Sequence, residues 1–526
     1  MIALAAVSGP LPKAGVVVVA ALAALALLAR DRRVGAVGML GALVLSPVLL
    51  LSDIWSSPQL RVAHRHPLVA VVGALFAVAV LIVCAALIAR RPNVIAPLAV
   101  FALPFRVPID AGGKTSNLLV VLYLVVAAGA LAWIGTALGV WGRPVAERAG
   151  GPGGAAAEAG SWRQASLGGW VTRLLALVVV LYGIQSVYSP AFEQALQNMV
   201  FFYVPFALLY QLLRDVVWTR ALLRNCLVLL AALAVVFSLI GFVEYATKTI
   251  ILNPKLVVAN DLHTYFTVNS VFFDPDIFGR FLALTMILLA ALLLYDHPPR
   301  EQIATVIVLA ILWTCLVLTL SRSSLGALLV GLAILAALRW KPSRALVAVA
   351  VVIALGALAV AASPKTFGLN QGINGASSGR GGLVGGGLSL FAHRPVWGYG
   401  SGSFVHEYRV HHRATATTLS ASHTIPVTIA AEQGLIGELA YLALVLVALV
   451  CLLRHTRGDP VRSAIGAAFA ALVFHTLLYA DFLEDPVTWT LLGVGVALAS
   501  SGAHGLTAQG RSAAQPDEPA AATARS

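Results

Sequence analysis

The chain has 526 residues, of which 60% are hydrophobic and 11% charged, and its mean hydropathy is +0.90. Water-soluble domains carry about 25% charged residues, so this composition excludes a soluble enzyme or a soluble binding module. The formal net charge is +13. The basic residues form short clusters between apolar runs, however, which is typical of membrane topology and does not indicate a nucleic-acid partner.

Apolar runs long enough to cross a bilayer recur along the whole chain. Backbone polar groups in hydrocarbon must be satisfied within the segment, so we predict an all-α, polytopic bundle of about 15 helices, within a range of roughly 13 to 17. The expected helices occupy residues 15–29, 34–52, 68–90, 92–108, 117–141, 169–188, 197–213, 221–244, 278–295, 302–320, 324–338, 343–362, 425–453, 461–482 and 486–500. In the run 92–108, Pro97, Pro104 and Arg106 interrupt the pattern, so a half-helix is the alternative there. The first run lacks a cleavage-site pattern and is expected to remain as a helix.

Basic clusters set the expected orientation. In this helix assignment they all fall on one side, which the positive-inside rule makes cytoplasmic. The clusters are Arg30/Arg32/Arg33, Arg90/Arg91, Arg143/Arg148/Arg163, Arg214/Arg220, Arg339/Lys341/Arg344 and Arg454/Arg457/Arg462. We therefore expect the long loops 245–277 and 363–424 to face outward, in a protein of the cytoplasmic (inner) membrane.

The predicted organisation has six parts. They are N-terminal transmembrane helices at 1–141, a cytoplasmic linker at 142–168, central transmembrane helices at 169–362, an extracytoplasmic loop at 363–424, C-terminal transmembrane helices at 425–500 and a disordered cytoplasmic tail at 501–526.

The loop 363–424 carries more basic residues than an outward loop needs. Its only acidic residue is Glu407, against this set: Lys365, Arg380, Arg394, Arg409, Arg413, His393, His406, His411, His412 and His423. This concentration favours an anionic ligand, and the alternative is a solvated basic loop.

Three polar stretches are candidates for chemistry. Thr319-Leu320-Ser321-Arg322-Ser323-Ser324 separates two apolar runs, and it is either a phosphate-binding cradle or an interfacial turn with a snorkelling arginine. The second stretch joins Ser377–Gly382 to Arg394–Phe404; its glycines let backbone approach a ligand, or they make a flexible connector.

The third stretch, Ser422-His423-Thr424-Ile425-Pro426, directly precedes an apolar helix that contains Glu432. His423 suits a proton acceptor near neutral pH, or it is a hydrogen-bonded structural residue. For Glu432, burial inside the bundle costs less than contact with lipid.

No metal or other cofactor is expected. The four cysteines, Cys84, Cys226, Cys315 and Cys451, all lie in apolar runs without a metal-ligand spacing, so neither a disulfide framework nor a thiolate site is predicted. Asp274-Pro275-Asp276 is the nearest acidic pair, and its expected role is a turn ahead of the helix at 278.

These motifs resemble the O-antigen ligase and Wzy-type O-antigen polymerase superfamily, whose members are polytopic, GT-C-like membrane glycosyltransferases. The resemblance covers about residues 220–500. It rests on TLSRSSLGALL at 319–329, SSGR with HRPVWGYGSGSF at 377–404, and SHTIPVTIAAEQGLIGELAYL at 422–442, and the stretch 481–498 looks like the family's closing helix.

The resemblance implies transfer of a glycan from a polyprenyl (undecaprenyl) diphosphate carrier to a glycan, lipid or protein acceptor, outside the cytoplasmic membrane and without metal. Arg322 and Arg380 then stabilise the departing diphosphate, and His423 takes the proton from the acceptor hydroxyl. The further residues expected to bind substrate are Arg394, Ser321, Tyr399, Glu432 and Arg280.

Two other functions remain open at this point. A flippase for lipid-linked oligosaccharides would need two alternating halves, and no repeat relates the halves of this sequence. A peptidoglycan glycosyltransferase of the shape, elongation and division type would share the helical core and the carrier, and its outward acid would be Asp274 or Asp276.

Overall fold

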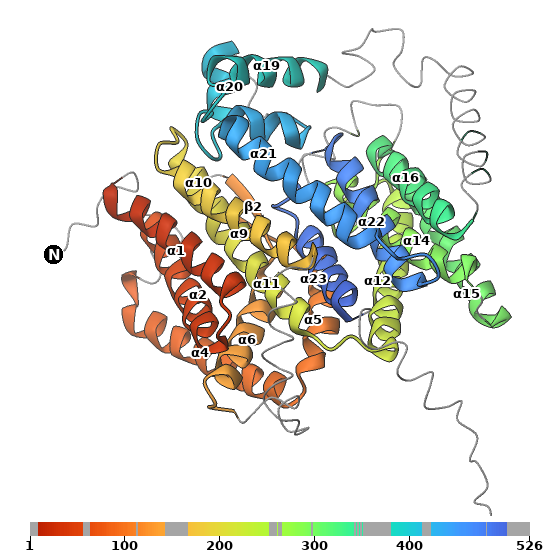
Figure 1. Cartoon of the computed structure of the whole chain (residues 1–526), viewed down its shortest axis with the longest axis horizontal. Coiled ribbons are helices and arrows are strands. Elements are labelled where there is room, and N and C mark those ends of the chain that lie inside the picture. Colours follow the sequence, from red (N-terminus) through yellow and green to blue (C-terminus); the bar gives the residue numbers. More distant parts are fainter. Residues whose placement is uncertain are drawn as a thin grey trace, which may run out of the picture.

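The computed structural model describes residues 9–55, 64–111, 114–141, 167–251, 260, 266–295, 298–340, 343, 347, 350, 380–412, 422–479 and 481–501. It confirms the all-α, polytopic bundle (Figure 1). Within these residues, eleven helices are long and apolar enough to cross a membrane. The protein is therefore a multi-pass membrane protein.

The first helices pack in a row. They are α1 (Pro10–Leu28), α2 (Arg32–Ile54), α4 (Pro67–Arg90) and α6 (Val120–Ala137). In this row α1 packs against α2, α2 against α6 and α6 against α4. At Gly38, a Cβ atom would lie 2.9 Å from the backbone nitrogen of Ala26, so the small residue lets α1 and α2 approach closely. Helix α4 packs against α6 and exposes most of its apolar side chains, as a lipid-facing helix does.

Residues 92–108 take the half-helix alternative. A 3-10 turn, η2 (Pro92–Val94), leads into α5 (Ile95–Ala102), which ends shortly before Pro104. An antiparallel pair of short strands follows, β1 (Val107–Ala111) and β2 (Lys114–Leu118). This hairpin was not predicted from the sequence, which showed only apolar runs on either side of it.

The predicted helix at 197–213 begins earlier and is interrupted. After α9 (Leu167–Ser186), the chain forms α10 (Phe192–Asn198), a π-helical turn η3 (Met199–Tyr203) and α11 (Val204–Asp215). Pro205 lies in the first turn of α11 and has no N–H to donate backward, which accounts for the wider turn before it.

The central helices lie within a few residues of their predicted ranges. They are α12 (Arg220–Thr247), α14 (Pro275–Leu294), α15 (Pro299–Leu318) and α16 (Arg322–Arg339). Proline opens both α14 and α15, a position where its missing N–H costs nothing. The predicted helix at 343–362 and the linker and tail lie almost wholly outside the described residues.

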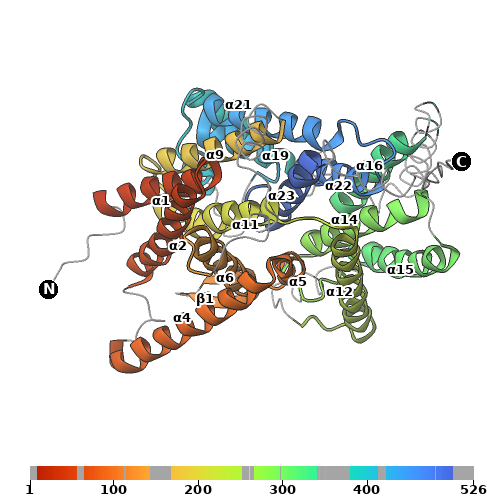
Figure 2. The same cartoon turned by 60° about the horizontal axis from the view of Figure 1, so that its bottom comes forward.

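The C-terminal helices are α21 (Ile425–Leu453), α22 (Pro460–Thr476) and α23 (Pro486–Ser501). The first of them has the predicted bounds. Helix α22 ends at Thr476 instead of residue 482. The residues between α22 and α23 include Asp481, Glu484 and Asp485, and we call them the acidic connection. Helix α21 packs against α9 and α22, and α11 packs against α23, which joins the N-terminal and C-terminal groups (Figure 2).

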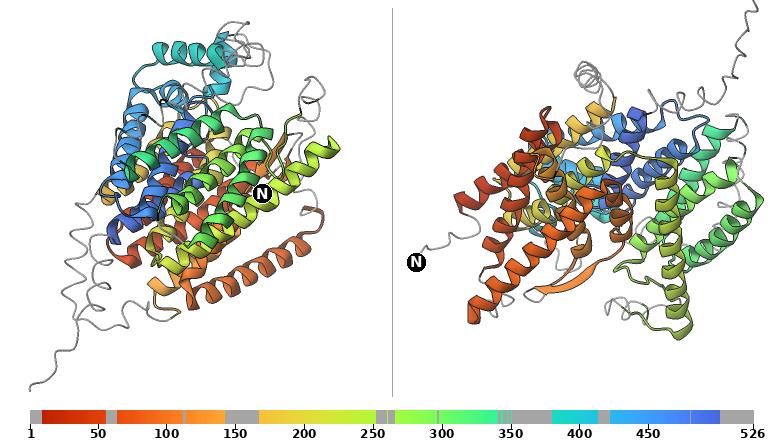
Figure 3. Two further views of the ribbon diagram at one scale, coloured as in Figure 1. Left: turned by 90° about the vertical axis from the view of Figure 1, so that its right-hand side faces the viewer. Right: turned by 90° about the horizontal axis from the view of Figure 1, so that it is seen from below.

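The long loop contains two helices that the sequence analysis did not assign, α19 (Arg380–His393) and α20 (Phe404–His412). Figures 1 and 3 show them lying across one end of the bundle, above the start of α21. The part of the loop at 363–379 lies outside the described residues.

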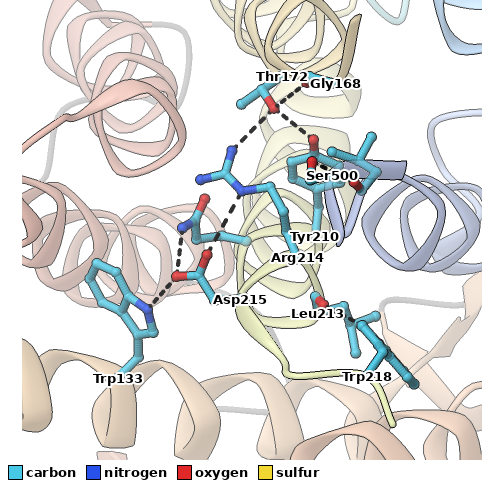
Figure 4. Close-up of polar contacts among 11 residues, drawn as sticks. Trp133, Gly168, Thr172, Tyr210, Leu213, Arg214, Asp215, Trp218 and Ser500 are labelled. Carbon is cyan, nitrogen blue, oxygen red and sulfur yellow. Dashed lines mark hydrogen bonds and ion pairs between the residues drawn. The ribbon is translucent and has the colours of Figure 1, made fainter. Parts of the chain in front are cut away.

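The opposite end is tied together by polar contacts among α6, α9 and α11 (Figure 4). Asp215 accepts hydrogen bonds from Trp133 Nε1 at 2.9 Å and from Gln211 Nε2 at 3.2 Å. Arg214 donates to Thr172 Oγ1 at 3.1 Å, and Arg32 lies over the ring of Trp133. Two of the basic clusters, those that contain Arg32 and Arg214, therefore meet at this end. Its cytoplasmic side stays a prediction.

Helix α21 contains a break that receives the long loop. Gly434 has φ 65° and ψ −163° inside the helix, a conformation that favours glycine. The loop backbone lies against the break, because Leu435 N donates to Pro395 O at 2.7 Å and Gly400 N donates to Glu432 O at 2.7 Å. A Cβ at Gly434 would lie 2.3 Å from Val396 O, so only glycine fits there.

We predict that Gly434→Ala will lower the melting temperature of the detergent-solubilised chain by several degrees. Backbone strain at positive φ costs about 1–3 kcal/mol, and the clash with Val396 O adds to it. Gly458→Ala is the matched control, since Gly458 also has positive φ but nothing lies within 4 Å of its added Cβ. Equal losses in the two variants would contradict the close docking of the loop.

Candidate functional site

A network of hydroxyl groups joins the first turns of α14 and α16. Ser321 caps α16, accepting from Ser324 N at 3.2 Å, and its hydroxyl donates to Asp276 Oδ1 at 2.5 Å. Ser323 Oγ donates to the same carboxylate oxygen at 2.9 Å. The two helices approach closely because Gly279 faces Ser324, whose Oγ lies 2.7 Å from the position of an added Cβ.

His475, in the last turn of α22, extends this network. Its Nε2 lies 3.2 Å from both Ser323 Oγ and Ser324 Oγ, and the residue is fully buried. The two serine hydroxyls donate to Asp276, so their oxygens remain acceptors for an N–H at Nε2 of His475. Three helices are thus bonded to one another through polar side chains.

Tyr479 lies beside both histidines. Its ring centroid is 6.0 Å from that of His423 and 5.6 Å from that of His475. Its side chain lies next to that of Asp274, whose Oδ1 accepts from Asp276 N at 2.7 Å. Burial, together with the neighbouring Asp276 carboxylate, raises the pKa of Asp274 to about 6. Asp274 is the N-cap of α14, which agrees with the predicted turn.

His423 is held in a left-handed conformation, with φ 60°. Ser422 fixes the turn by donating to Thr424 O at 2.7 Å and accepting from Thr424 N at 3.1 Å. Thr424 Oγ1 also donates to Leu477 O at 3.1 Å, which ties the start of α21 to the end of α22. These contacts place the partly buried His423 next to Tyr479.

Arg280 forms a buried ion pair below this region. Its NH2 group is 2.7 Å from Asp485 Oδ2, and the two side chains are only 2% and 3% exposed. A second guanidinium nitrogen donates to Asp481 O at 3.3 Å. Asp485 also caps α23 through Val487 N. Arg280 is therefore bound to the acidic connection, and its contact with substrate stays a prediction.

The acidic connection before α23 reaches a second helix group through Glu484. Its Oε1 accepts from Asn198 Nδ2 at 2.9 Å, and Asn198 also donates to Tyr182 OH at 3.0 Å. Burial and the neighbouring Asp481 carboxylate raise the pKa of Glu484. A raised pKa favours the protonated acid, which avoids a second negative charge next to Asp481.

Glu432 anchors the Gly-rich part of the loop. Its Oε2 accepts from Gly402 N at 2.8 Å and its Oε1 accepts from Phe404 N at 3.0 Å, at the start of α20. Ser401 continues the attachment, because its Oγ donates to Tyr182 O at 2.9 Å. The glycines here form a tightly bonded segment, and binding of substrate by Glu432 stays a prediction.

A separate polar group, which we call the loop cluster, consists of Arg394, Tyr399, Glu407 and His411. The Arg394 guanidinium carbon lies 4.5 Å from the Tyr399 ring centroid, and Tyr399 OH lies 3.2 Å from His411 Nε2. His411 Nδ1 lies 3.4 Å from Glu407 Oε2. Arg394 is exposed, so the cluster presents a cation stacked on an aromatic ring.

The structure divides the predicted site residues between two places. Ser321 and His423 belong to what we call the helix-start cluster, which comprises Asp274, Asp276, Ser321, Ser323, Ser324, His423, His475 and Tyr479. Arg322 is the exposed first residue of α16 beside it, and Arg280 lies in the first turns of α14. Arg394 and Tyr399 belong to the loop cluster. Arg380 is the first residue of α19, but its side chain lies outside the described part of the chain.

The sequence analysis missed Asn198 and Tyr182 in these networks and also a group near the end of the chain: His475, Tyr479, Asp481, Glu484 and Asp485. The available signal was a dense polar run directly after an apolar helix, within His475–Asp485. Extending the helix prediction to residue 482 concealed it. Among the described residues, no group of three His, Cys, Asp or Glu side chains has an arrangement that could hold a metal ion.

A family model described as O-antigen ligase matches residues 307–442, from α15 into α21. A search of curated proteins finds no match to the chain. The family match confirms the predicted resemblance to the O-antigen ligase and Wzy-type superfamily. It includes Arg322, Arg380, Arg394, His423 and Glu432, but it does not extend to Arg280 or to the acidic connection.

We predict that the stability of the chain will depend on pH through Asp274. The folded state binds this proton more tightly than the unfolded chain, because the pKa rises from 3.8 to about 6. Stability from this group is therefore fully present below pH of about 4 and is lost as pH rises through about 6.

Asp274→Asn keeps an N-cap acceptor and removes the titration. Between pH 5 and pH 8, the melting temperature of the native chain should fall a few degrees more than that of the variant. Asp459→Asn, an equivalent cap substitution at the start of α22, retains Asp274 and should preserve the native slope. Parallel curves for Asp274→Asn and the native chain would argue against a raised pKa.

Proposed function

From the O-antigen ligase family that residues 307–442 match, we infer that this chain is a membrane glycosyltransferase of the ligase or polysaccharide polymerase type. We propose that it moves a glycan from a polyprenyl diphosphate carrier to an acceptor hydroxyl on a glycan, lipid or protein, at the extracytoplasmic side of the inner membrane. The family match carries the proposal, since the three residues proposed for the chemistry all lie within it.

In the proposed reaction, the acceptor oxygen forms a bond to the anomeric carbon while the bond from that carbon to the diphosphate breaks. Negative charge develops on the departing diphosphate. Arg322 is the first residue of α16, where the helix dipole adds positive potential to that of the guanidinium. This location supports its assignment to the diphosphate, and the assignment of Arg380 rests on the family match.

The acceptor hydroxyl must lose its proton, and we assign that proton to His423. The support is positional: His423 is fixed at the start of α21 by the turn around Ser422, and Tyr479 restricts one side of its ring. An imidazole titrates near neutral pH, so it can take the proton during attack and release it to water afterwards.

The loop cluster is our candidate for contacts with the sugar. The exposed guanidinium of Arg394 offers hydrogen-bond donors, and the buried ring of Tyr399 supports it from beneath. Ser321, Arg280 and Glu432 were predicted to bind substrate, and we propose that they act mainly by holding the helices and the loop that carry the other residues.

The roles of the arginines and the histidine can be separated in one experiment. The full chain, reconstituted in vesicles, is supplied with a polyprenyl diphosphate glycan and an acceptor. We predict that His423→Ala will retain donor binding while turnover falls by roughly 10²–10⁴-fold. His412→Ala, at an exposed position of α20, is the matched control and should turn over normally. A normal rate in correctly inserted His423→Ala would remove this histidine from the mechanism.

For Arg322→Ala we predict loss of both donor binding and transfer, because a charge-assisted contact to the diphosphate disappears. Arg322→Lys should also be impaired, since an ammonium group lacks the planar fork of the guanidinium. Arg409→Ala removes an exposed arginine from α20 and serves as the control. Movement of intact donor across the membrane, without transfer, would favour the flippase alternative.

A further inference from the structure

The segment Arg394–Tyr399 crosses α21 at the break around Gly434, and its backbone is firmly bonded there. Leu435 N donates to Pro395 O at 2.7 Å, and Ile436 N donates to Val396 O at 3.4 Å. From the turn directly after α9, the hydroxyl of Tyr188 donates to Trp397 O at 2.7 Å. The backbone of the segment is therefore fixed relative to two membrane-spanning helices.

The side chains of the same segment are nevertheless exposed. Trp397 is 59% exposed and Val396 is 51% exposed, and the neighbouring Tyr188 is 43% exposed. Large apolar side chains on a rigid backbone gain nothing from contact with water. An apolar or interfacial environment outside the chain would remove that cost.

The position of the segment along α21 identifies that environment. On the C-terminal side of the break, exposed apolar residues of α21 follow one another at helical spacing: Leu435, Leu439, Leu442, Leu446 and Val450. Such a stripe is typical of a helix face that contacts lipid. Residues 435–453 rise about 1.5 Å each and so cover about 28 Å, close to the hydrocarbon thickness of about 30 Å. The break thus lies at one surface of the hydrocarbon layer, and the stripe ends where Val396 and Trp397 begin.

We propose that Tyr188, Val396 and Trp397 form a membrane-interface anchor, inserted among the lipid headgroups and upper acyl chains of the leaflet next to α19 and α20. Tryptophan and tyrosine are the residues that favour this layer, because each combines an apolar ring with a polar group. Arg394, which precedes the anchor and stacks on Tyr399, then lies at the level of the lipid phosphates.

The anchor has a consequence for the geometry of the loop. The anchor and the break in α21 fix the loop cluster at the headgroup layer, and α19 and α20, which lie across this end of the bundle (Figures 1 and 3), then lie on the water side of that layer. This inference goes beyond the proposed glycosyl transfer and does not depend on it. It concerns only where the chain meets lipid.

The test uses nitroxide labels on the full chain in vesicles of phosphatidylethanolamine and phosphatidylglycerol. Exposed Cys84 is first replaced by Ala; Cys226, Cys315 and Cys451 are buried. Single labels are placed with Trp397→Cys, with Leu446→Cys as the hydrocarbon reference and with Val410→Cys, 60% exposed on α20, as the reference nearer to water. Collision rates with oxygen, which concentrates in lipid, and with a water-soluble nickel chelate are then measured.

We expect the ratio of oxygen to nickel collisions to be highest at 446, intermediate at 397 and several-fold lower at 410. A label at 397 that behaves like the one at 410 would place the segment in water and overturn the proposal. Protection of 397 from both reagents would also overturn it, in favour of a second copy or another protein on this surface. Val396→Cys repeats the measurement should the tryptophan substitution disturb folding.

Discussion

The break at Gly434 determines how the rest of this end of the molecule is built. One residue in a left-handed conformation frees backbone groups in the middle of a long helix, and in a membrane protein such groups must find partners. The loop supplies them through Pro395 and Gly400, and Glu432 fixes the start of α20 with both carboxylate oxygens. Two short helices are thereby held across the bundle by backbone contacts and by the Glu432 carboxylate. The chain has a shaped surface here because α21 is not a continuous helix.

The helix-start cluster is held together differently, by hydrogen bonds between the ends of helices. The first turns of α14 and α16 and the last turn of α22 meet, and their unsatisfied polar groups are shared through Asp276, Ser321 and His475. Such a network leaves Arg322 at the surface while its neighbours are buried. The serine-rich turn therefore fixes the position of Arg322 at the start of α16 without burying its side chain. Because the turn is bonded to α14 and α22, this position depends on the packing of three helices.

Much of the fold follows from hydropathy alone, and much of the site does not. Helices such as α21 and α14 were predicted closely because a continuous apolar run has few alternatives in lipid. The hairpin after α5 and the helices α19 and α20 were missed because their sequences are polar or Gly-rich, and tertiary contacts decide their conformation. Candidate residues such as Ser321 and His423 were proposed where a motif stands between apolar runs, and their roles stay predictions. Tyr479 and Asp485 were missed because their importance lies in contacts made across helices that are distant in sequence.

The charges around the helix-start cluster constrain where an anionic carrier can approach. Asp274, Asp276, Asp481 and Asp485 lie on the inner side of this region, and Arg280 compensates only part of their charge because it is paired with Asp485. A diphosphate that entered among these carboxylates would meet like charges in a low-dielectric interior, which is costly. The exposed Arg322 and the basic surface of the loop carry the opposite sign. This distribution of charge supports the proposal that the carrier diphosphate binds at the exposed Arg322 and not among the acids. In that proposal the acids have a structural role, since they lie next to Tyr479, whose ring lies beside that of His423. The division between a basic exterior and an acidic interior is thus as important to the proposed chemistry as any single residue.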